Sequence, residues 1–151
     1  MIAVLQRVKH AKVEINSEIK AECGVGILVL LGAGKEDTEE DCRLLADKIS
    51  KLRIFQDGDG KMNLSVCDVG GSVITVPNFT LFASYRKGNR PDFFDAAPPA
   101  AAKPLFDYFV RYISSLVPSS GCGVFGADMK VELLNDGPVT IVMDSKVLAK
   151  K

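Results

Sequence analysis

The first third of the chain alternates apolar and polar positions with a period of two, which is the pattern of a half-buried β-strand. Its apolar positions are Ile2, Val4, Val8, Val13 and Ile15. Asn16-Ser17 then predicts a turn, and residues 27–31 form a continuous apolar run that is closed by Gly32-Ala33-Gly34. Because this run has no polar face, it predicts a central strand that is buried on both sides.

The period then lengthens to three and four residues, which predicts an α-helix beginning after Thr38. The apolar positions of this helix are Cys42, Leu45, Ile49 and Leu52. Glu39, Glu40 and Asp41 lie in its first turn, where negative charge suits the helix dipole. Residues 57–60, Asp-Gly-Asp-Gly, predict a turn after it.

The middle of the chain predicts one further strand and a long loop. Residues 72–76 are rich in β-branched side chains, and Pro77 marks the end of this strand or an edge position. Residues 84–99 are rich in Arg, Gly, Asn and Pro. Loops of this length tend to be functional or mobile.

A second helix and a hairpin complete the pattern. The helix has an apolar face made of Leu105, Phe106, Phe109, Tyr112, Ile113 and Leu116. Pro104 removes one backbone hydrogen bond, so we expect it to displace the helix start or to bend the first turns. Residues 129–134 and 139–143 flank residues 135–138, Asn-Asp-Gly-Pro, as two hairpin strands would. The elements together predict a single α+β domain with a mostly antiparallel sheet and two helices.

Composition agrees with one compact domain of 151 residues, since 47% of the side chains are hydrophobic, 25% are charged, and no repeat or linker is visible. The longest apolar stretch, residues 25–31, is far shorter than the roughly 20 residues of a membrane-spanning helix. Arg7 comes too early for the apolar core of a signal peptide. We therefore expect a cytoplasmic protein without a membrane partner.

Charge and cysteine content narrow the function classes. Nineteen basic and nineteen acidic residues give a formal net charge of zero, which excludes nucleic-acid binding through overall positive charge and leaves a local basic patch open. The cysteines are Cys23, Cys42, Cys67 and Cys122. Their spacing fits neither a zinc site nor a redox pair, so we expect single buried thiols in a reducing compartment.

The familiar catalytic motifs are missing. His10 is the one histidine and lies in an alternating strand, so a hydrolase built on a Ser-His or Cys-His pair is not expected. Residues 32–35 resemble the end of a phosphate-binding loop, but Val29 and Glu36 replace its first glycine and its magnesium-binding hydroxyl. Residues 57–60 lack the distal glutamate of a calcium loop. Catalysis would have to rest on backbone donors, hydroxyls or the substrate, and composition alone leaves a small binding module equally open.

Two segments resemble the D-aminoacyl-tRNA deacylase family, also known as the D-Tyr-tRNA deacylase family: residues 78–81, Asn-Phe-Thr-Leu, and residues 135–140, Asn-Asp-Gly-Pro-Val-Thr. Further blocks match the family in order and spacing, namely Gln6-Arg7-Val8, Arg53-Ile54-Phe55, Gly60-Lys61-Met62-Asn63, Gly88-Asn89-Arg90-Pro91, Asp107-Tyr108-Phe109 and Phe125-Gly126-Ala127-Asp128-Met129. The resemblance covers about residues 1–143. It predicts a deacylase domain over residues 1–145, followed by a short Lys-rich tail, residues 146–151.

The resemblance implies a homodimer of β-barrel-like α+β subunits, with sites where the first motif of one subunit faces the Gly-Pro motif of the other. The implied reaction is hydrolysis of the ester that joins a D-amino acid, or glycine, to the 3′ adenosine of tRNA, with no cofactor and no metal. A cis Gly137–Pro138 peptide is implied to reject L-amino acids through main-chain atoms. The terminal 2′-hydroxyl of the RNA is implied to assist attack by water.

The resemblance assigns catalysis to Phe79 and Thr80, whose backbone amides we favour as oxyanion donors, with the Thr80 hydroxyl as nucleophile kept as the alternative. The implied substrate-binding residues are Arg7, Asn78, Phe125, Gly137 and Pro138. Phe125 would stack on the terminal adenine, and Arg7 would support the Gly-Pro loop. Without the resemblance, these residues would be a strand hydroxyl, a core ring, a surface arginine and a trans-proline turn. Residues 85–90 offer charge and an aromatic ring to RNA, or else form a solvated loop.

Departures from the family pattern keep other functions open. Pro77-Asn78 stands where the family has Ser-Gln, so an oxyanion role of that glutamine would pass to a shorter amide. A paralogous branch, thought to remove L-alanine from mischarged tRNA, carries Pro at this position and a trans Gly-Pro bond, whereas Phe79, Val139 and residues 135–140 favour the D-specific branch. A further alternative is a relative that binds nucleic acid without hydrolysis. Such relatives carry a long basic C-terminal extension, and here the tail is short.

Overall fold

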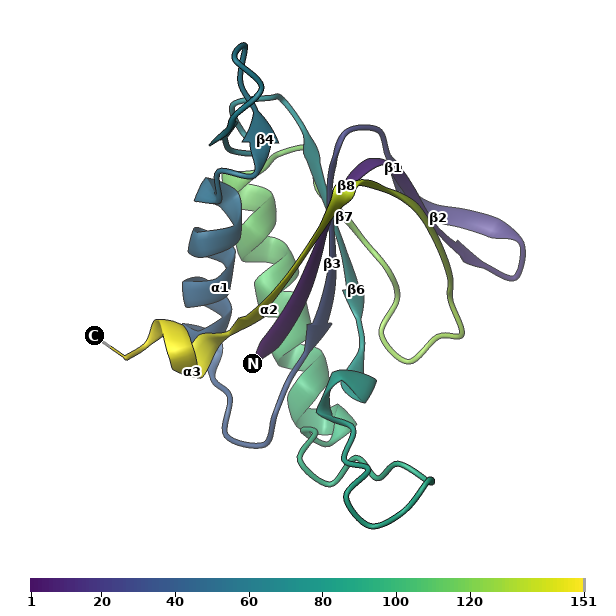
Figure 1. Ribbon diagram of the computed structural model, residues 1–151. Coiled ribbons are helices and arrows are strands. Elements are labelled where there is room, and N and C mark those ends of the chain that lie inside the picture. The colour runs from purple at the N-terminus through teal and green to yellow at the C-terminus, as the bar shows by residue number, and fades with distance from the viewer. Residues whose placement is uncertain (151) are drawn as a thin grey trace.

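A computed structural model describes residues 1–150 of the chain. Its elements follow in the order β1 (Ile2–Ile15), β2 (Glu18–Cys23), β3 (Gly26–Gly32), α1 (Glu39–Lys51), β4 (Phe55–Gln56), β5 (Met62–Leu64), β6 (Ser72–Pro77), the 3₁₀ helix η1 (Phe79–Phe82), α2 (Pro99–Leu116), β7 (Gly121–Cys122), β8 (Lys130–Asp144) and α3 (Ser145–Leu148). Figure 1 shows a strongly curved sheet with α1 and α2 against one of its faces. This architecture confirms the predicted α+β fold.

The long strand β1 organises the sheet because three strands pair with it. Its first half pairs with β3, its second half pairs with β2, and β8 pairs along both halves, all antiparallel. β6 then joins β3 in parallel, and β7 joins β6 in parallel. The sheet is therefore mostly antiparallel and nearly closed into a barrel. β4 and β5 form a separate hairpin whose turn, residues 57–60, was predicted.

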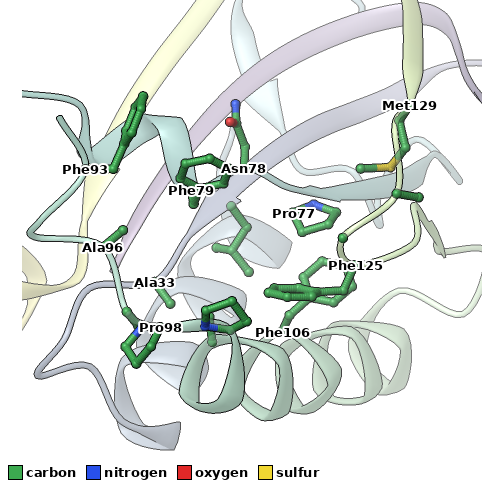
Figure 2. Close-up of a pocket in the computed structure, with 16 residues that line it drawn as sticks. Ala33, Pro77, Asn78, Phe79, Phe93, Ala96, Pro98, Phe106, Phe125 and Met129 are labelled. Atoms are coloured by element: carbon green, nitrogen blue, oxygen red, sulfur yellow. The ribbon is translucent and has the colours of Figure 1, made fainter. Parts of the chain in front are cut away.

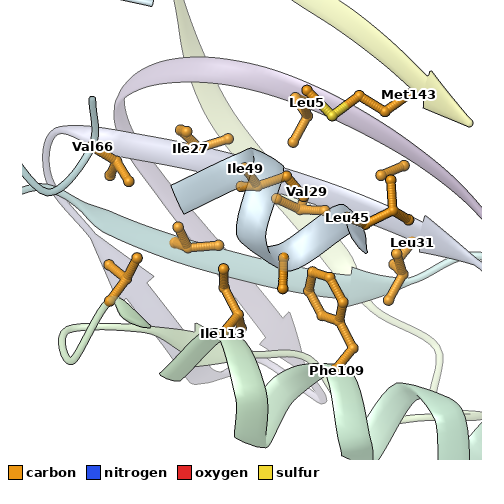
Figure 3. Packing of buried hydrophobic residues seen from close by; sticks show 14 of the residues in the cluster. Leu5, Ile27, Val29, Leu31, Leu45, Ile49, Val66, Phe109, Ile113 and Met143 are labelled. Carbon is orange, nitrogen blue, oxygen red and sulfur yellow. The ribbon is translucent and has the colours of Figure 1, made fainter. Parts of the chain in front are cut away.

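The two faces of β3 explain its uninterrupted apolar sequence. Ile27, Val29 and Leu31 point toward the helices, where they pack in the main core with residues of α1 and α2 such as Leu45 and Phe109 (Figure 3). Leu28 belongs instead to the second core, which fills the inside of the curl and also contains Val8, Ala11, Val13, Ile74 and Val76. The predicted burial of this strand on both faces is confirmed.

Both predicted helices are present. α1 begins where expected, and the Asp41 carboxylate accepts hydrogen bonds from the Thr38 backbone N–H (2.8 Å) and hydroxyl (3.1 Å). α2 begins with Pro99 in its first turn, where a missing N–H costs nothing. Pro104 therefore lies inside α2 and does not displace its start.

The predicted C-terminal hairpin is wrong. Residues 130–144 form one continuous strand, β8, and both of its halves pair with β1 in the same direction. Between the pairs Gln6↔Thr140 and Val8↔Asn135, β8 advances five residues while β1 advances two. The extra residues, among them Gly137 and Pro138, form a bulge. The turn residues were recognised correctly, but they interrupt a strand instead of reversing it.

Two other features differ from the prediction. Residues 145–148 form a third helix, α3, so the predicted Lys-rich tail begins inside a helix; its last residue, Lys151, lies outside the described residues. Thr80 lies in the 3₁₀ helix η1 and not on a strand. No helix within residues 1–150 has the length and apolar character needed to cross a bilayer.

Candidate functional site

An apolar cavity of about 520 Å³ lies at the carboxyl ends of the parallel strands β3 and β6 (Figure 2). Phe79 and Phe93 lie on one side of it, and Phe106 and Phe125 lie on the side nearest α2. The remaining lining residues are Leu31, Ala33, Pro77, Asn78, Ala96, Ala97, Pro98, Pro99, Ala102, Gly126, Ala127 and Met129. A cavity of this size and lining suits a flat group with apolar faces, such as a nucleobase.

Small residues leave the space for this cavity. The segment that leads into α2 supplies Ala96, Ala97 and Ala102, and Ala97 N donates to Ala33 O across the cavity wall (2.9 Å). Gly32 allows η1 to approach β3, because a Cβ there would come within 2.9 Å of Asn78 O. Phe106 and Phe125 form an aromatic wall, with ring centroids 6.2 Å apart.

The 3₁₀ helix η1 forms the mouth of the cavity. Its position is fixed by a hydrogen bond from Asn78 N to Leu31 O (2.8 Å). Phe79 packs edge-to-face on Phe93, with centroids 5.0 Å apart, yet 57% of Phe79 remains exposed. Thr80 is exposed beside it, and its hydroxyl donates a hydrogen bond to Asn78 Oδ1.

The backbone amides of Phe79 and Thr80 are free to donate. They open a helix, so the helix itself offers them no acceptor. Among residues 1–150 neither amide donates a hydrogen bond to any other group. Two adjacent N–H groups at an apolar mouth can together receive one oxygen atom that carries developing negative charge.

Titratable side chains are absent from this mouth. None of the sixteen residues that line the cavity is Asp, Glu, His, Cys, Lys, Arg or Tyr. Within residues 1–150 no three His, Cys, Asp or Glu side chains are grouped closely enough to hold a metal ion. Cys42 lies in the main core, where burial raises the pKa of its thiol to about 12, so this thiol is no nucleophile at neutral pH.

Arg7 is buried beneath the β8 bulge, so the surface interpretation of this arginine is wrong. Only 6% of it is exposed. Its Nε donates to Asp136 O (2.9 Å) and its Nη1 donates to Ile54 O (2.7 Å), while the Asp136 carboxylate lies 3.5 Å away. Arg7 thereby ties the bulge to the segment after α1.

The bulge has a defined shape. The Gly137–Pro138 peptide is cis, as the resemblance implied. Gly137 has φ +138°, and a Cβ there would come within 2.8 Å of Val139 Cγ2, so this position requires glycine. The Asn135 side chain accepts from Val139 N (3.1 Å) and donates to Val139 O (3.0 Å). Gly137 and Pro138 are both exposed at the surface.

The expected site residues fall into two groups. Asn78, Phe79 and Phe125 line the cavity, with Thr80 beside its mouth. Arg7, Gly137 and Pro138 meet at the bulge and line no part of the cavity. Sequence reasoning missed the cavity residues Phe93, Ala96, Ala97, Ala102, Phe106 and Met129. The one signal that could have found some of them is the run of small residues that leads into α2.

Comparison with known proteins gives a consistent result. The family model described as D-Tyr-tRNA(Tyr) deacylase matches residues 4–144. A D-aminoacyl-tRNA deacylase of Alkaliphilus metalliredigens (strain QYMF) is 52% identical over 146 residues, which are 97% of this chain and 98% of that protein. One of Anaeromyxobacter dehalogenans (strain 2CP-C) is 51% identical over 148 residues, which are 98% of this chain and 99% of that protein.

Two solved structures are similar over nearly the whole chain. A structure titled "c-Myc DNA Unwinding Element Binding Protein" has a TM-score of 0.90 and 39% sequence identity, and covers 95% of this chain and 98% of that one. A structure titled "Structural Analysis of a probable eukaryotic D-amino acid tRNA deacylase" has a TM-score of 0.82 and 15% identity, covering 94% and 97%. The second likeness concerns the fold alone.

Proposed function

The chain belongs to the D-Tyr-tRNA(Tyr) deacylase family, and from that membership we propose that it hydrolyses the ester bond of D-aminoacyl-tRNA and of Gly-tRNA, releasing free amino acid and tRNA. Its relatives at about half identity are D-aminoacyl-tRNA deacylases over their full length, so the chain is a carboxylic ester hydrolase of this class. The observation that carries the proposal is the apolar cavity with two free backbone amides at its mouth.

The terminal adenosine of the tRNA is proposed to occupy the cavity. A nucleobase stacked on an aromatic side chain gains about 1–3 kcal/mol, and Phe125 lines the cavity against Phe106. The ester carbonyl then lies at the mouth, where the Phe79 and Thr80 amides receive the oxygen that becomes negative when water attacks the carbonyl carbon.

The attacking water needs a proton acceptor, and no side chain that lines the cavity titrates. We therefore assign the transfer of this proton to the 2′-hydroxyl of the terminal ribose, which lies next to the ester: it accepts a proton from the water and passes its own to the ribose 3′-oxygen. The water oxygen bonds to the carbonyl carbon, and the bond between that carbon and the 3′-oxygen breaks as the 3′-oxygen takes up the proton. In this mechanism Thr80 acts through Asn78. The Thr80 hydroxyl donates a hydrogen bond to Asn78 Oδ1, so the Asn78 amide can donate a hydrogen bond to the substrate through Nδ2.

Rejection of L-amino acids is assigned to the bulge at Gly137 and Pro138. Its main chain can act as a gate because Arg7 and Asn135 hold it in one shape. Within one chain this bulge does not line the cavity, so the gate is proposed to come from the partner subunit of a homodimer. An apolar row across the sheet supports an interface, since Val142, 69% exposed, pairs with the half-buried Val4, which pairs with the half-buried Leu30.

Two alternatives are weighed by specific observations. The L-alanine-editing branch carries proline at the position of Pro77, and Pro77 lines the cavity, which favours that branch as the first alternative. The similar structure titled as a DNA unwinding element binding protein favours nucleic-acid binding as a second candidate function.

We also propose that the protein works in the cytoplasm, because its four cysteines are all unpaired.

Parallel hydrolysis assays test the proposed function. Purified protein is incubated with D-Tyr-tRNA, L-Tyr-tRNA, Gly-tRNA and L-Ala-tRNA, and the released amino acid is measured. We expect fast release from D-Tyr-tRNA and Gly-tRNA and spontaneous rates from the other two. Hydrolysis of L-Ala-tRNA with D-Tyr-tRNA intact would move the protein to the other branch, and binding without any hydrolysis would make it a nucleic-acid-binding relative.

A further inference from the structure

We propose that residues 85–90, here named the basic loop, form a second contact for tRNA. Their cationic side chains would bind phosphates of the unpaired 3′ end just before the terminal nucleotide. This inference rests on the proposed function, because it assumes that the terminal adenosine enters the cavity. It adds a contact outside the cavity, made by side chains that have no role in the ester chemistry.

The basic loop is attached directly to the rim of the cavity. Its two ends are joined by an antiparallel bridge, in which Ser84 N donates to Asp92 O and Asp92 N donates to Ser84 O, both at 2.8 Å. Phe93 follows the bridge, lines the cavity and packs on Phe79. In Figure 1 the loop projects from the end of the molecule that carries η1 and the start of α2. Its base is therefore fixed next to the place where the ester lies.

The cations of the basic loop are unpaired. Arg86, Lys87 and Arg90 are all exposed, and none of them lies within 4.0 Å of a carboxylate in residues 1–150. The Asp92 carboxylate at the base of the loop accepts from Phe94 N instead. The chain as a whole has no net charge, so three unpaired cations within five residues are a local excess.

The cavity and the basic loop complement each other chemically. The cavity lining contains no Lys or Arg, so it can take a base and a ribose but cannot neutralise the phosphates that precede them. The basic loop supplies that charge and also presents Tyr85, 78% exposed, on which an unpaired base can stack. A single-stranded RNA end needs both contacts together, whereas an acidic protein would use the charge alone.

The test removes the three charges together in the variant Arg86→Gln/Lys87→Gln/Arg90→Gln. The matched control is Lys48→Gln/Lys51→Gln/Lys61→Gln, which removes three exposed lysines without ion pairs from α1 and the β4–β5 hairpin and gives the same net charge. The Kd for uncharged tRNA is measured against salt concentration, and kcat/KM is measured on D-Tyr-tRNA and on the short ester D-tyrosyl-adenosine.

We expect the slope of log Kd against log salt to fall by about 2 in the loop variant, from about 0.7 for each of three single-strand phosphates. When the salt concentration is lowered from 1 M to 0.1 M, the loop variant should therefore gain about 100-fold less affinity than wild type. For the loop variant, kcat/KM on D-Tyr-tRNA should fall because KM rises, while kcat/KM on the short ester stays at the wild-type value. The control variant should keep wild-type values on both substrates.

Three results would overturn the proposal: an unchanged salt slope in the loop variant, an equal change in the control, or an equal loss of activity on the short ester. Binding of an acidic peptide that competes with tRNA at the basic loop would assign the loop to a protein partner instead. A wild-type protein that hydrolyses neither ester refutes the proposed function, and the salt slope for uncharged tRNA still decides the role of the loop.

Discussion

Thr80 and Asn78 form the polar pair at the mouth of the cavity, and the direction of their hydrogen bond supports the roles proposed for them. The Thr80 hydroxyl donates to Asn78 Oδ1, and no residue that lines the cavity could take the hydroxyl proton. A hydroxyl nucleophile needs an adjacent base. In the proposed mechanism Thr80 is therefore a positioning residue for the Asn78 amide.

Replacing Thr80 by Ala is expected to lower the single-turnover rate on D-Tyr-tRNA by no more than about tenfold, because the backbone donors and the substrate hydroxyl remain. Loss of a true nucleophile costs about 10⁴-fold or more. Thr80→Ser keeps the hydroxyl and serves as the control, with a rate near wild type. A loss in Thr80→Ala as large as that of heat-inactivated protein would restore Thr80 as the nucleophile.

Thr75 carries the one buried side-chain oxygen without a hydrogen-bond partner in the part of the chain that the structure describes. It lies in the middle of β6, fully buried, between Val29 of β3 and Cys122 of β7. An unsatisfied buried hydroxyl costs about 1–3 kcal/mol. We expect Thr75→Val to raise the free energy of unfolding by about 1 kcal/mol in urea titrations, since valine has the same shape without the hydroxyl. A destabilised variant would show that the hydroxyl has a partner.

At the residue scale, the sequence predicted which side chains belong to the site better than it predicted their burial and their contacts. Asn78, Phe79 and Phe125 were expected in the site and do line the cavity. The burial of Arg7 was not evident, because an arginine in a strand that alternates in polarity is ordinarily exposed. Only the folded structure shows that the carbonyl oxygens of Asp136 and Ile54 accept hydrogen bonds from the Arg7 guanidinium.

At the element scale, Arg7 is the buried side chain that joins the bulge of β8 to the segment after α1. The Arg7 guanidinium reaches Asp136 O and Ile54 O at once, and the single ammonium of lysine cannot match that fork. Arg7→Lys should therefore lower the unfolding free energy by about 2 kcal/mol, the value of a charged hydrogen bond.

The same variant should also relax chiral selectivity if the bulge is the gate. The ratio of D-Tyr-tRNA to L-Tyr-tRNA hydrolysis is expected to fall. Lys9→Gln is the control, because Lys9 is exposed and its ammonium lies 3.6 Å from the Asp136 carboxylate without reaching the main chain of the bulge through a hydrogen bond in residues 1–150. An unchanged ratio in a destabilised Arg7→Lys protein would give Arg7 a purely structural role and remove the bulge from the selectivity mechanism.

The start of α1 and the start of α3 are joined through Asp41. Burial alone would raise the pKa of Asp41, but hydrogen bonds from the Ser145 hydroxyl (2.6 Å) and from Thr38 outweigh burial and hold the pKa below its ordinary value. A carboxylate with a depressed folded pKa stabilises the protein above its ordinary pKa of about 3.9, and that stabilisation is lost as the pH falls through the folded value.

Asp41→Asn is expected to be less stable than wild type at pH 7 and to lose less stability between pH 7 and pH 3, because it has no proton to take up. Urea unfolding at both pH values measures this difference. Glu40→Gln is the control, since Glu40 is exposed in the same turn and makes no hydrogen bond or ion pair in residues 1–150. A pH dependence in Asp41→Asn equal to that of wild type would contradict the assignment.

At the scale of the whole molecule, the class of fold was predictable from periodicity, but the pairing of strands was not. A period of two located β1, and a period of three to four located α1 and α2. A continuous apolar run located β3, and a run of β-branched residues located β6. The short strand β7 and the parallel pairing of β3 with β6 leave no local pattern, because they depend on the path of the chain through α1 and α2. Asn-Asp-Gly-Pro predicts a hairpin because it satisfies the local requirements of a tight turn as well as those of a bulge.

Within one chain, the site residues that meet at the bulge are separate from those that line the cavity. Each complete site is therefore proposed to combine the cavity of one protomer with the bulge of its partner. In a twofold-symmetric dimer such an arrangement produces two identical sites across one interface.

Subunit mixing of a cavity variant with a bulge variant tests the shared site most directly. Phe125→Ala weakens the cavity, and Gly137→Ala distorts the bulge, because a Cβ at φ +138° meets Val139 Cγ2 at 2.8 Å. The first variant should be slow on both substrates, and the second should hydrolyse L-Tyr-tRNA as well as D-Tyr-tRNA. After equal amounts are mixed and allowed to exchange, about half of the dimers pair the two variants, and each pairs one intact cavity with one intact bulge. We expect hydrolysis of L-Tyr-tRNA to fall to about half of the summed rate of the unmixed variants, with hydrolysis of D-Tyr-tRNA unchanged. An L-Tyr-tRNA rate equal to that sum would show that the site is not shared between protomers.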